Sequence, residues 1–77
     1  MNIYNVLGIL YQEKLMSVDE ISKLYSPMWM IRYYERFEFL IKETRERFYS
    51  ELMAPYEELY LALKRMHPTL GQSRVPN

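Results

Sequence analysis

Large apolar side chains recur at three- and four-residue spacing through most of this 77-residue chain. Such spacing places them on one side of an α-helix, whereas a half-buried strand needs apolar and polar residues to alternate. Only two glycines interrupt the pattern, and the sequence contains no alternating run bounded by turn residues. The sequence therefore predicts four helices, at Asn2–Lys14, Val18–Tyr25, Pro27–Tyr49 and Pro55–Met66.

Three local signals accompany these helices. Ser17, followed three residues later by Glu20, matches a capping box, in which each side chain accepts from the other residue's backbone N–H group. Ser26 is expected to cap the next helix, with Pro27 at its first position, where a missing N–H group is not needed. Gly8 lies inside the first helix at a cost of up to about 1 kcal/mol relative to alanine. We therefore expect a neighbouring helix to approach closely at Gly8.

The longest predicted helix carries a stripe of apolar residues along one side. Its three-four spacing is typical of a helix face that is buried in a core. Trp29 and Phe39 fall outside the stripe, which leaves them to contact another element or another subunit. The pattern leaves open whether Ser50–Ala54 is a loop or a kinked continuation of a helix. The stripe consists of Met30, Tyr33, Tyr34, Phe37, Leu40, Ile41, Thr44 and Phe48.

Charged residues occupy most of the other side of that helix. Glu38 with Lys42 and Glu43 with Arg47 are four residues apart in the order that favours ion pairing, which contributes about 0.2–0.5 kcal/mol for each pair. The other charged residues expected on the solvent side are Arg32, Glu35, Arg36 and Glu46.

The length of the chain allows one domain. It contains no cysteine and one histidine, so neither a disulfide nor a Cys-based metal site can stabilise it. A dense apolar core and self-association are the remaining means for a chain of this length. We expect an all-α fold, a small three- to four-helix bundle with one long central helix that self-association completes. In this prediction residues 1–66 form the helical domain and residues 67–77 form an irregular C-terminal tail.

No pattern typical of an active site is present in the sequence. A glycine-rich phosphate loop, a nucleophile elbow and a Glu-x-x-His metal motif are all missing. His67 precedes a proline at a predicted helix end, where a surface position is expected. We therefore predict a protein that is not an enzyme, with no catalytic residues, no cofactor, no metal and no small-molecule substrate.

Charge and hydropathy limit the classes of partner. Ten basic residues balance ten acidic ones, and this zero net charge argues against a partner that is bound mainly through phosphates. The uncharged stretch Met1–Gln12 is too short to span a bilayer and lacks the basic start of a signal peptide. We expect a soluble protein of the cytoplasm with no membrane partner.

Ser17–Phe37 reads SVDEISKLYSPMWMIRYYERF and resembles the helix-turn-helix of mercury-resistance-type regulators, with IRYYER in the second helix. That resemblance implies DNA binding, with Lys23, Arg32 and Arg36 as candidate phosphate contacts. A recognition helix offers polar side chains to base edges from its first turns, and here those turns carry the apolar run Met28–Met30. A helix-turn-helix regulator is therefore the alternative function.

A second resemblance covers Tyr4 to Met66. The segments LGILYQEKLMSVDEI, IRYYERFEFLIKETRERF and YEELYLALKRM occur in the order seen in an uncharacterised family of small helical domains from microbes and their viruses. The resemblance implies a small helical fold and a location in a cell, an infected host cell or a virus particle. The function of that family is unknown, so no site residues come with it.

Large side chains suited to protein interfaces are abundant in the sequence. Tyr, Trp, Met and Arg are enriched at the centres of interfaces, and this chain has eight tyrosines and six methionines. The predicted helices offer more large apolar side chains than one small core needs. We predict a non-enzymatic interaction or accessory subunit that binds protein and self-associates, with a dimer favoured. The candidate interface residues are Trp29, Phe39, Tyr56, Tyr60 and Met66.

Overall fold

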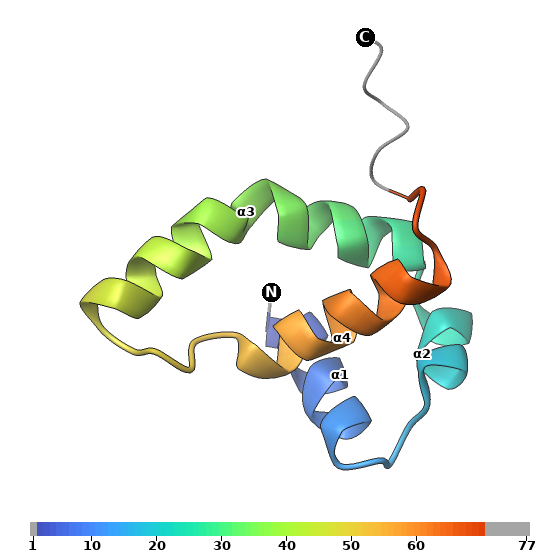
Figure 1. The fold of residues 1–77 in the computed structure, drawn as a ribbon. Helices are drawn as coiled ribbons and strands as arrows, with labels where there is room; N and C mark the ends of the chain where they lie inside the picture. The colour runs from blue at the N-terminus through green and yellow to red at the C-terminus, as the bar shows by residue number, and fades with distance from the viewer. Residues whose placement is uncertain (1, 71–77) are drawn as a thin grey trace, which may run out of the picture.

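The computed structural model describes residues 2–70, which contain four α-helices (Figure 1). The four predicted helices are confirmed, although α1 and α3 end two residues earlier than predicted, α2 ends one residue earlier and α4 begins one residue earlier. No strand occurs within residues 2–70, in agreement with the all-α fold class. The part of the predicted tail from residue 71 onward lies outside the described residues. The helices are α1 (Asn2–Gln12), α2 (Val18–Leu24), α3 (Pro27–Arg47) and α4 (Ala54–Met66).

Helix α4 packs most closely against α1, and it also contacts α3, which runs along one edge of the molecule (Figure 1). The closest approach of α1 and α4 is at Gly8, where a Cβ atom would overlap the carbonyl group of Pro55 and lie 2.7 Å from the backbone nitrogen of Tyr56. That nitrogen donates a hydrogen bond to Asn5 Oδ1 at 3.2 Å. The expected close contact at Gly8 is therefore confirmed, and it is a contact with helix backbone.

The core contains side chains from all four helices. Leu7 of α1, Ile21 of α2 and Met30 of α3 pack together with residues of α4. Tyr34 and Tyr56 form a second cluster next to it with Ile41. The buried hydrophobic residues among those described are Leu7, Ile21, Met30, Ile31, Tyr34, Ile41, Tyr56, Leu59, Ala62 and Leu63.

The predicted core stripe of α3 is partly wrong. Phe48 is 81% exposed because α3 ends at Arg47 and the chain turns away there. Leu40 is 48% exposed, and Tyr33 is also exposed, because α4 covers only one side of α3. Ile31, which the stripe omits, is fully buried. The inner side of α3 is therefore narrower than the apolar spacing suggests, and apolar residues also line its outer side.

The helix starts follow the local signals in part. The capping box at α2 is confirmed, since Glu20 N–H donates to Ser17 Oγ at 3.1 Å and Ser17 N–H donates to Glu20 Oε1 at 2.8 Å. Ser26 is the N-cap residue of α3 and Pro27 lies at its start, as predicted, but the Ser26 side chain makes no capping hydrogen bond. The backbone carbonyl of Ser26 instead accepts from Met30 N–H at 3.2 Å.

We predict that Ser17→Ala lowers the free energy of unfolding by about 1 kcal/mol, the usual cost of losing an N-cap. Urea denaturation followed by circular dichroism measures this change. Ser26→Ala is the matched control, because Ser26 precedes a longer helix but makes no capping bond with its side chain. Equal losses in the two variants would show that the capping box does not stabilise the fold.

Residues 48–53 form a loop between α3 and α4, and Ala54 is the first residue of α4, which decides the question that the sequence left open for Ser50–Ala54. Met53 has a φ of 59°, in the left-handed region, and α4 begins at the next residue. Arg45 connects the loop to both helices, because its Nε atom donates to the carbonyl of Leu52 at 2.7 Å and its Nη1 atom lies 2.8 Å from Glu57 Oε1. The end of α3 is thereby tied to the start of α4.

The start of the predicted tail is irregular but packed. Leu70 contacts the core cluster near the end of α4. Its backbone N–H donates to the carbonyl of His67 at 3.1 Å, and its own carbonyl accepts from Lys64 Nζ at 3.1 Å. Residues 67–70 therefore cover the end of α4.

Candidate protein-interaction surface

The outer face of α3 lies opposite the side that packs on α4. Its residues at positions 29, 33, 36, 40, 43 and 47 are alternately four and three residues apart, which keeps them on one side of the helix. A parallel row at positions 32, 39 and 46 flanks them. All of these residues are exposed except Arg32, which is half-buried. We define the outer face of α3 as Trp29, Arg32, Tyr33, Arg36, Phe39, Leu40, Glu43, Glu46 and Arg47.

Large apolar side chains on this face reach solvent although the core of the subunit is filled by other residues. Trp29 is 58% exposed and Phe39 is 70% exposed. Tyr33 lies between them along the helix, Leu40 follows Phe39, and both are exposed. Exposed apolar residues that gather on one face mark an interaction site more often than isolated ones do.

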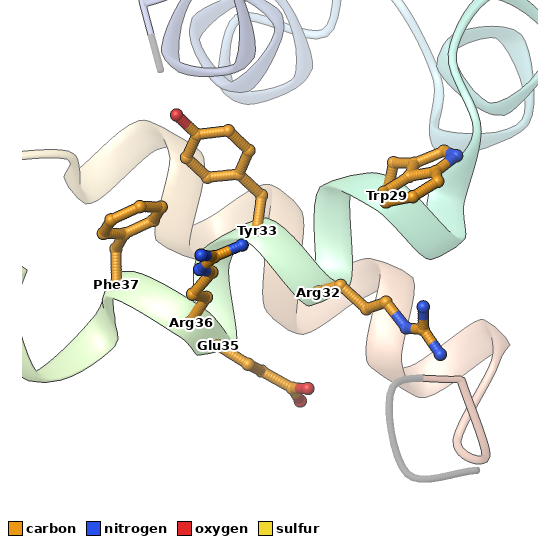
Figure 2. A pocket seen from close by; sticks show the side chains of 6 residues that line it. All are labelled: Trp29, Arg32, Tyr33, Glu35, Arg36 and Phe37. Carbon is orange, nitrogen blue, oxygen red and sulfur yellow. The ribbon is translucent and has the colours of Figure 1, made fainter. Parts of the chain in front are cut away.

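A hollow of about 620 Å³ opens along the first half of α3 (Figure 2). Trp29, Tyr33 and Phe37 supply aromatic walls, and Arg32 and Arg36 supply two guanidinium groups. The rings of Tyr33 and Phe37 are 5.0 Å apart between centroids, and Arg36 Cζ lies 5.8 Å from the centre of the Phe37 ring. The hollow therefore combines aromatic surface with positive charge.

Neither arginine in the hollow forms an ion pair with a carboxylate among residues 2–70. The Nε atom of Arg32 is buried and lacks a hydrogen-bond partner within the same residues. Glu35 also lines the hollow, but its Oε2 atom already accepts from the Tyr60 hydroxyl at 2.8 Å and lies 3.4 Å from Lys64 Nζ. The prediction that Glu35 faces solvent is wrong, because α4 supplies both partners.

The predicted ion pairs along α3 are confirmed. Lys42 Nζ lies 3.3 Å from Glu38 Oε2, and Arg47 Nη2 lies 3.3 Å from Glu43 Oε2. All four side chains are well exposed, and an exposed pair of this kind contributes little to stability. Glu43 and Arg47 therefore remain available to a partner.

The tyrosines of α1, α3 and α4 form a connected group beneath the outer face. The Tyr4 ring lies 5.7 Å from that of Tyr33 and 5.4 Å from that of Tyr56, and the Tyr34 ring stacks on that of Tyr60 at 4.3 Å. The Tyr56 hydroxyl donates to the carbonyl of Met30 at 2.6 Å. These contacts fix α3 against α4 and so fix the direction of the outer face.

Burial in this group raises the pKa values of three tyrosines. Burial, followed by the nearby charge of Glu57, raises the pKa of Tyr34 to about 12. The pKa of Tyr56 is raised further, mainly by burial. The pKa of Tyr60 is raised by burial and by its hydrogen bond to Glu35. All three hydroxyls stay protonated at neutral pH.

The five candidate interface residues have different surroundings. Trp29, Phe39 and Met66 are exposed. Tyr56 is fully buried among its own helices, so its assignment to an interface is wrong. Tyr60 is half-buried and bonded to Glu35, which leaves it little surface for a partner. The residues that the sequence reasoning missed are Tyr33 and Leu40, which it assigned to the core.

The candidate DNA contacts are not brought together as one set. Arg32 and Arg36 both line the hollow on α3. Lys23 is exposed on α2 and does not line that hollow. In the first turn of α3, Trp29 is exposed, Met28 is half-buried and Met30 is fully buried.

A second exposed apolar face lies on α1. Ile3, Val6 and Ile9 each expose two-fifths or more of their surface on the side away from Gly8. Helix α1 contains no charged residue. Nothing on this face indicates the charge or shape of a partner, in contrast to the outer face of α3.

Among residues 2–70, no three His, Asp or Glu side chains gather closely enough to hold a metal ion. Over the same residues, no helix combines the length and apolar character needed to cross a membrane.

Comparisons with protein-family models, with curated proteins and with solved structures find no match to this chain.

Proposed function

We propose that this chain is a non-enzymatic protein-interaction subunit that self-associates, with a dimer as the favoured state. The observation that carries the proposal is the outer face of α3, where Trp29, Phe39 and Leu40 are exposed although the subunit already has a complete core. Association would complete a helical bundle around α3. An accessory or structural role in a microbe or a virus fits such a subunit.

The energetics of burial support this proposal. Covering apolar surface contributes roughly 25 cal/mol for each Å² removed from water, and large aromatic side chains dominate that contribution at interfaces. The formal net charge of the chain is zero, so two copies have no long-range repulsion to overcome. Trp29 and Phe39 are therefore the side chains from which association gains most.

Light scattering coupled to size-exclusion chromatography tests the proposal at tens of micromolar protein. The expected mass is about twice the 9.5 kDa of one chain. We predict that Trp29→Ser combined with Phe39→Ser weakens the dimer at least about 10-fold, because buried aromatic residues are typical hot spots. Leu61→Ser on α4 is the control, since Leu61 is also exposed but lies off the outer face of α3. A wild-type chain that stays monomeric would contradict self-association.

DNA binding is a second candidate, favoured by two features. Helices α2 and α3 are joined by only two residues, and Arg32 and Arg36 form no ion pair within residues 2–70. A DNA-binding protein should bind a random duplex at low salt and lose affinity steeply as salt increases. Fluorescence anisotropy with a labelled duplex measures this, and an absence of binding at low salt would exclude the regulator function.

A further inference from the structure

We propose that the outer face of α3 binds the same face of a second copy of this chain, with the two α3 helices antiparallel and centred near position 38. This inference rests on the proposed self-association and specifies its interface.

The spacing on the outer face is that of a helix that packs against another helix. Positions 29, 33, 36, 40, 43 and 47 follow the four-three repeat that gives a continuous line of contact between two helices. The 21 residues of α3 extend about 32 Å at 1.5 Å per residue. Helix α3 lies along one edge of the molecule, and its inner side is the one that faces α4 (Figure 1). A second helix can therefore lie along all six of these positions.

The charges on the face are ordered along the helix. Arg32 and Arg36 lie in its first half, and its second half carries Glu43, Glu46 and Arg47, of which Arg47 lies 3.3 Å from Glu43 of the same helix. An antiparallel pair brings the basic first half of each copy to the second half of the other, which carries the two glutamates. A parallel pair places arginines on arginines and glutamates on glutamates, and such contacts are repulsive. The charge order therefore selects the antiparallel arrangement.

One register satisfies both the spacing and the charges. When position 38 lies on the two-fold axis, the contact line overlaps over 29–47, which is nearly all of α3. In the flanking row, Arg32 then lies beside Glu46 of the second copy, and the two exposed Phe39 rings meet near the axis. Along the contact line, the opposed residues are Trp29 with Arg47, Tyr33 with Glu43, and Arg36 with Leu40.

The balance of charge on the face favours a second copy over an unrelated partner. An acidic partner would match Arg32 and Arg36 but would repel Glu43 and Glu46, and a basic partner would do the reverse. A two-fold symmetric contact uses one patch twice and so requires a patch that is complementary to itself. The outer face of α3 meets this requirement in both charge and apolar content.

Charge reversal on this face tests the interface directly. Arg32→Glu combined with Arg36→Glu leaves Arg47 as the one basic residue of the face, and Glu43→Arg combined with Glu46→Arg makes the whole face basic. We predict that each double variant dimerises at least about 100-fold more weakly than the wild type, because like charges then face each other. Mixing the two variants is expected to restore a 1:1 dimer. Sedimentation equilibrium measures the mass, and circular dichroism checks that each variant is folded.

Lys23→Glu combined with Arg65→Glu is the matched control, because it changes the net charge by the same amount as the acidic variant at exposed positions off α3. This control should still dimerise. If the acidic variant does not fold, the basic variant decides the test, since Glu43 and Glu46 are both exposed. A monomeric wild type would overturn the proposed self-association itself. A wild-type dimer that persists in both reversed variants would overturn only the α3 interface.

Cross-linking through single cysteines tests the orientation, and the absence of natural cysteines makes the result specific. In the antiparallel register, two copies of position 40 are offset by about 6 Å along the axis, whereas two copies of position 47 are about 27 Å apart. A short bis-maleimide should therefore cross-link Leu40→Cys but not Arg47→Cys. Efficient cross-linking of Arg47→Cys would indicate a parallel pair and overturn the proposal.

Discussion

Gly8→Ala is expected to destabilise this protein by at least about 2–3 kcal/mol, although alanine is the better helix former by roughly 1 kcal/mol. The added methyl group would overlap the carbonyl of Pro55, so α1 and α4 must move apart. The obstacle is backbone and not a flexible side chain, and therefore rotation of a side chain cannot relieve it. A domain of this size is stable by about 5 kcal/mol, so the variant should lose a large part of its stability.

The sign of the change in the free energy of unfolding shows whether α4 packs against α1 at Gly8. If α4 did not touch α1 at Gly8, the substitution would stabilise the protein through helix propensity alone. Thermal and urea denaturation followed by circular dichroism measure the change in the free energy of unfolding. Gln12→Ala is the control, because Gln12 is exposed at the end of the same helix. A Gly8→Ala variant that is as stable as the control or more stable would contradict the packing of α1 on α4.

Alkaline unfolding is the second large effect that we expect. The pKa of Tyr34 is raised from 10.0 to about 12, and the pKa values of Tyr56 and Tyr60 are raised as well. Each group therefore holds its proton more tightly in the folded chain than in the unfolded one. The stability that depends on these protons is fully present below pH 10 and is lost as pH rises towards the folded pKa. The raised pKa of Tyr34 alone corresponds to about 3 kcal/mol of the free energy of unfolding below pH 10, because one pKa unit corresponds to 1.36 kcal/mol.

We predict that the fold is lost cooperatively between about pH 10 and 12, together with ionisation of the buried tyrosines. Far-ultraviolet circular dichroism measures the loss of helix, and tyrosinate absorbance measures the ionisation. Tyr34→Phe should move the transition to higher pH, because it removes one ionising group whose hydroxyl has no hydrogen-bond partner within residues 2–70. Tyr49→Phe is the matched control, since Tyr49 is exposed on the loop before α4. Equal midpoints in the two variants would show that Tyr34 does not limit alkaline stability.

Much of the local structure could be predicted from the sequence because it depends on residues close together in the chain. The capping box of Ser17 and Glu20 spans one helical turn, and so do the ion pairs of α3. Gly8 predicted a close helix contact because glycine is unfavourable in a helix without such a reason. Ser26 shows the limit of these rules, since its residue type permits a side-chain cap that α3 does not use.

The candidate site was predictable only in part. Trp29 and Phe39 lie outside the apolar stripe, which predicts contact with another element or another subunit, and both are exposed. Tyr56 and Leu40 were assigned to the wrong environments, the first to an interface and the second to the core. Apolar spacing identifies a side of a helix, but α3 has apolar residues on two sides. Spacing alone therefore could not tell which side α4 covers.

The sequence by itself determined the four helices, their order and the first residues of α1, α2 and α3, since hydrogen bonds within a helix and its caps are local. The tertiary structure decided that α4 packs on α1 at Gly8 and on the inner side of α3. That choice buries Tyr34 and Tyr56 and leaves Trp29, Phe39 and Leu40 in solvent. The physical reason is that burial depends on contacts between residues far apart in the chain, which helical periodicity does not encode.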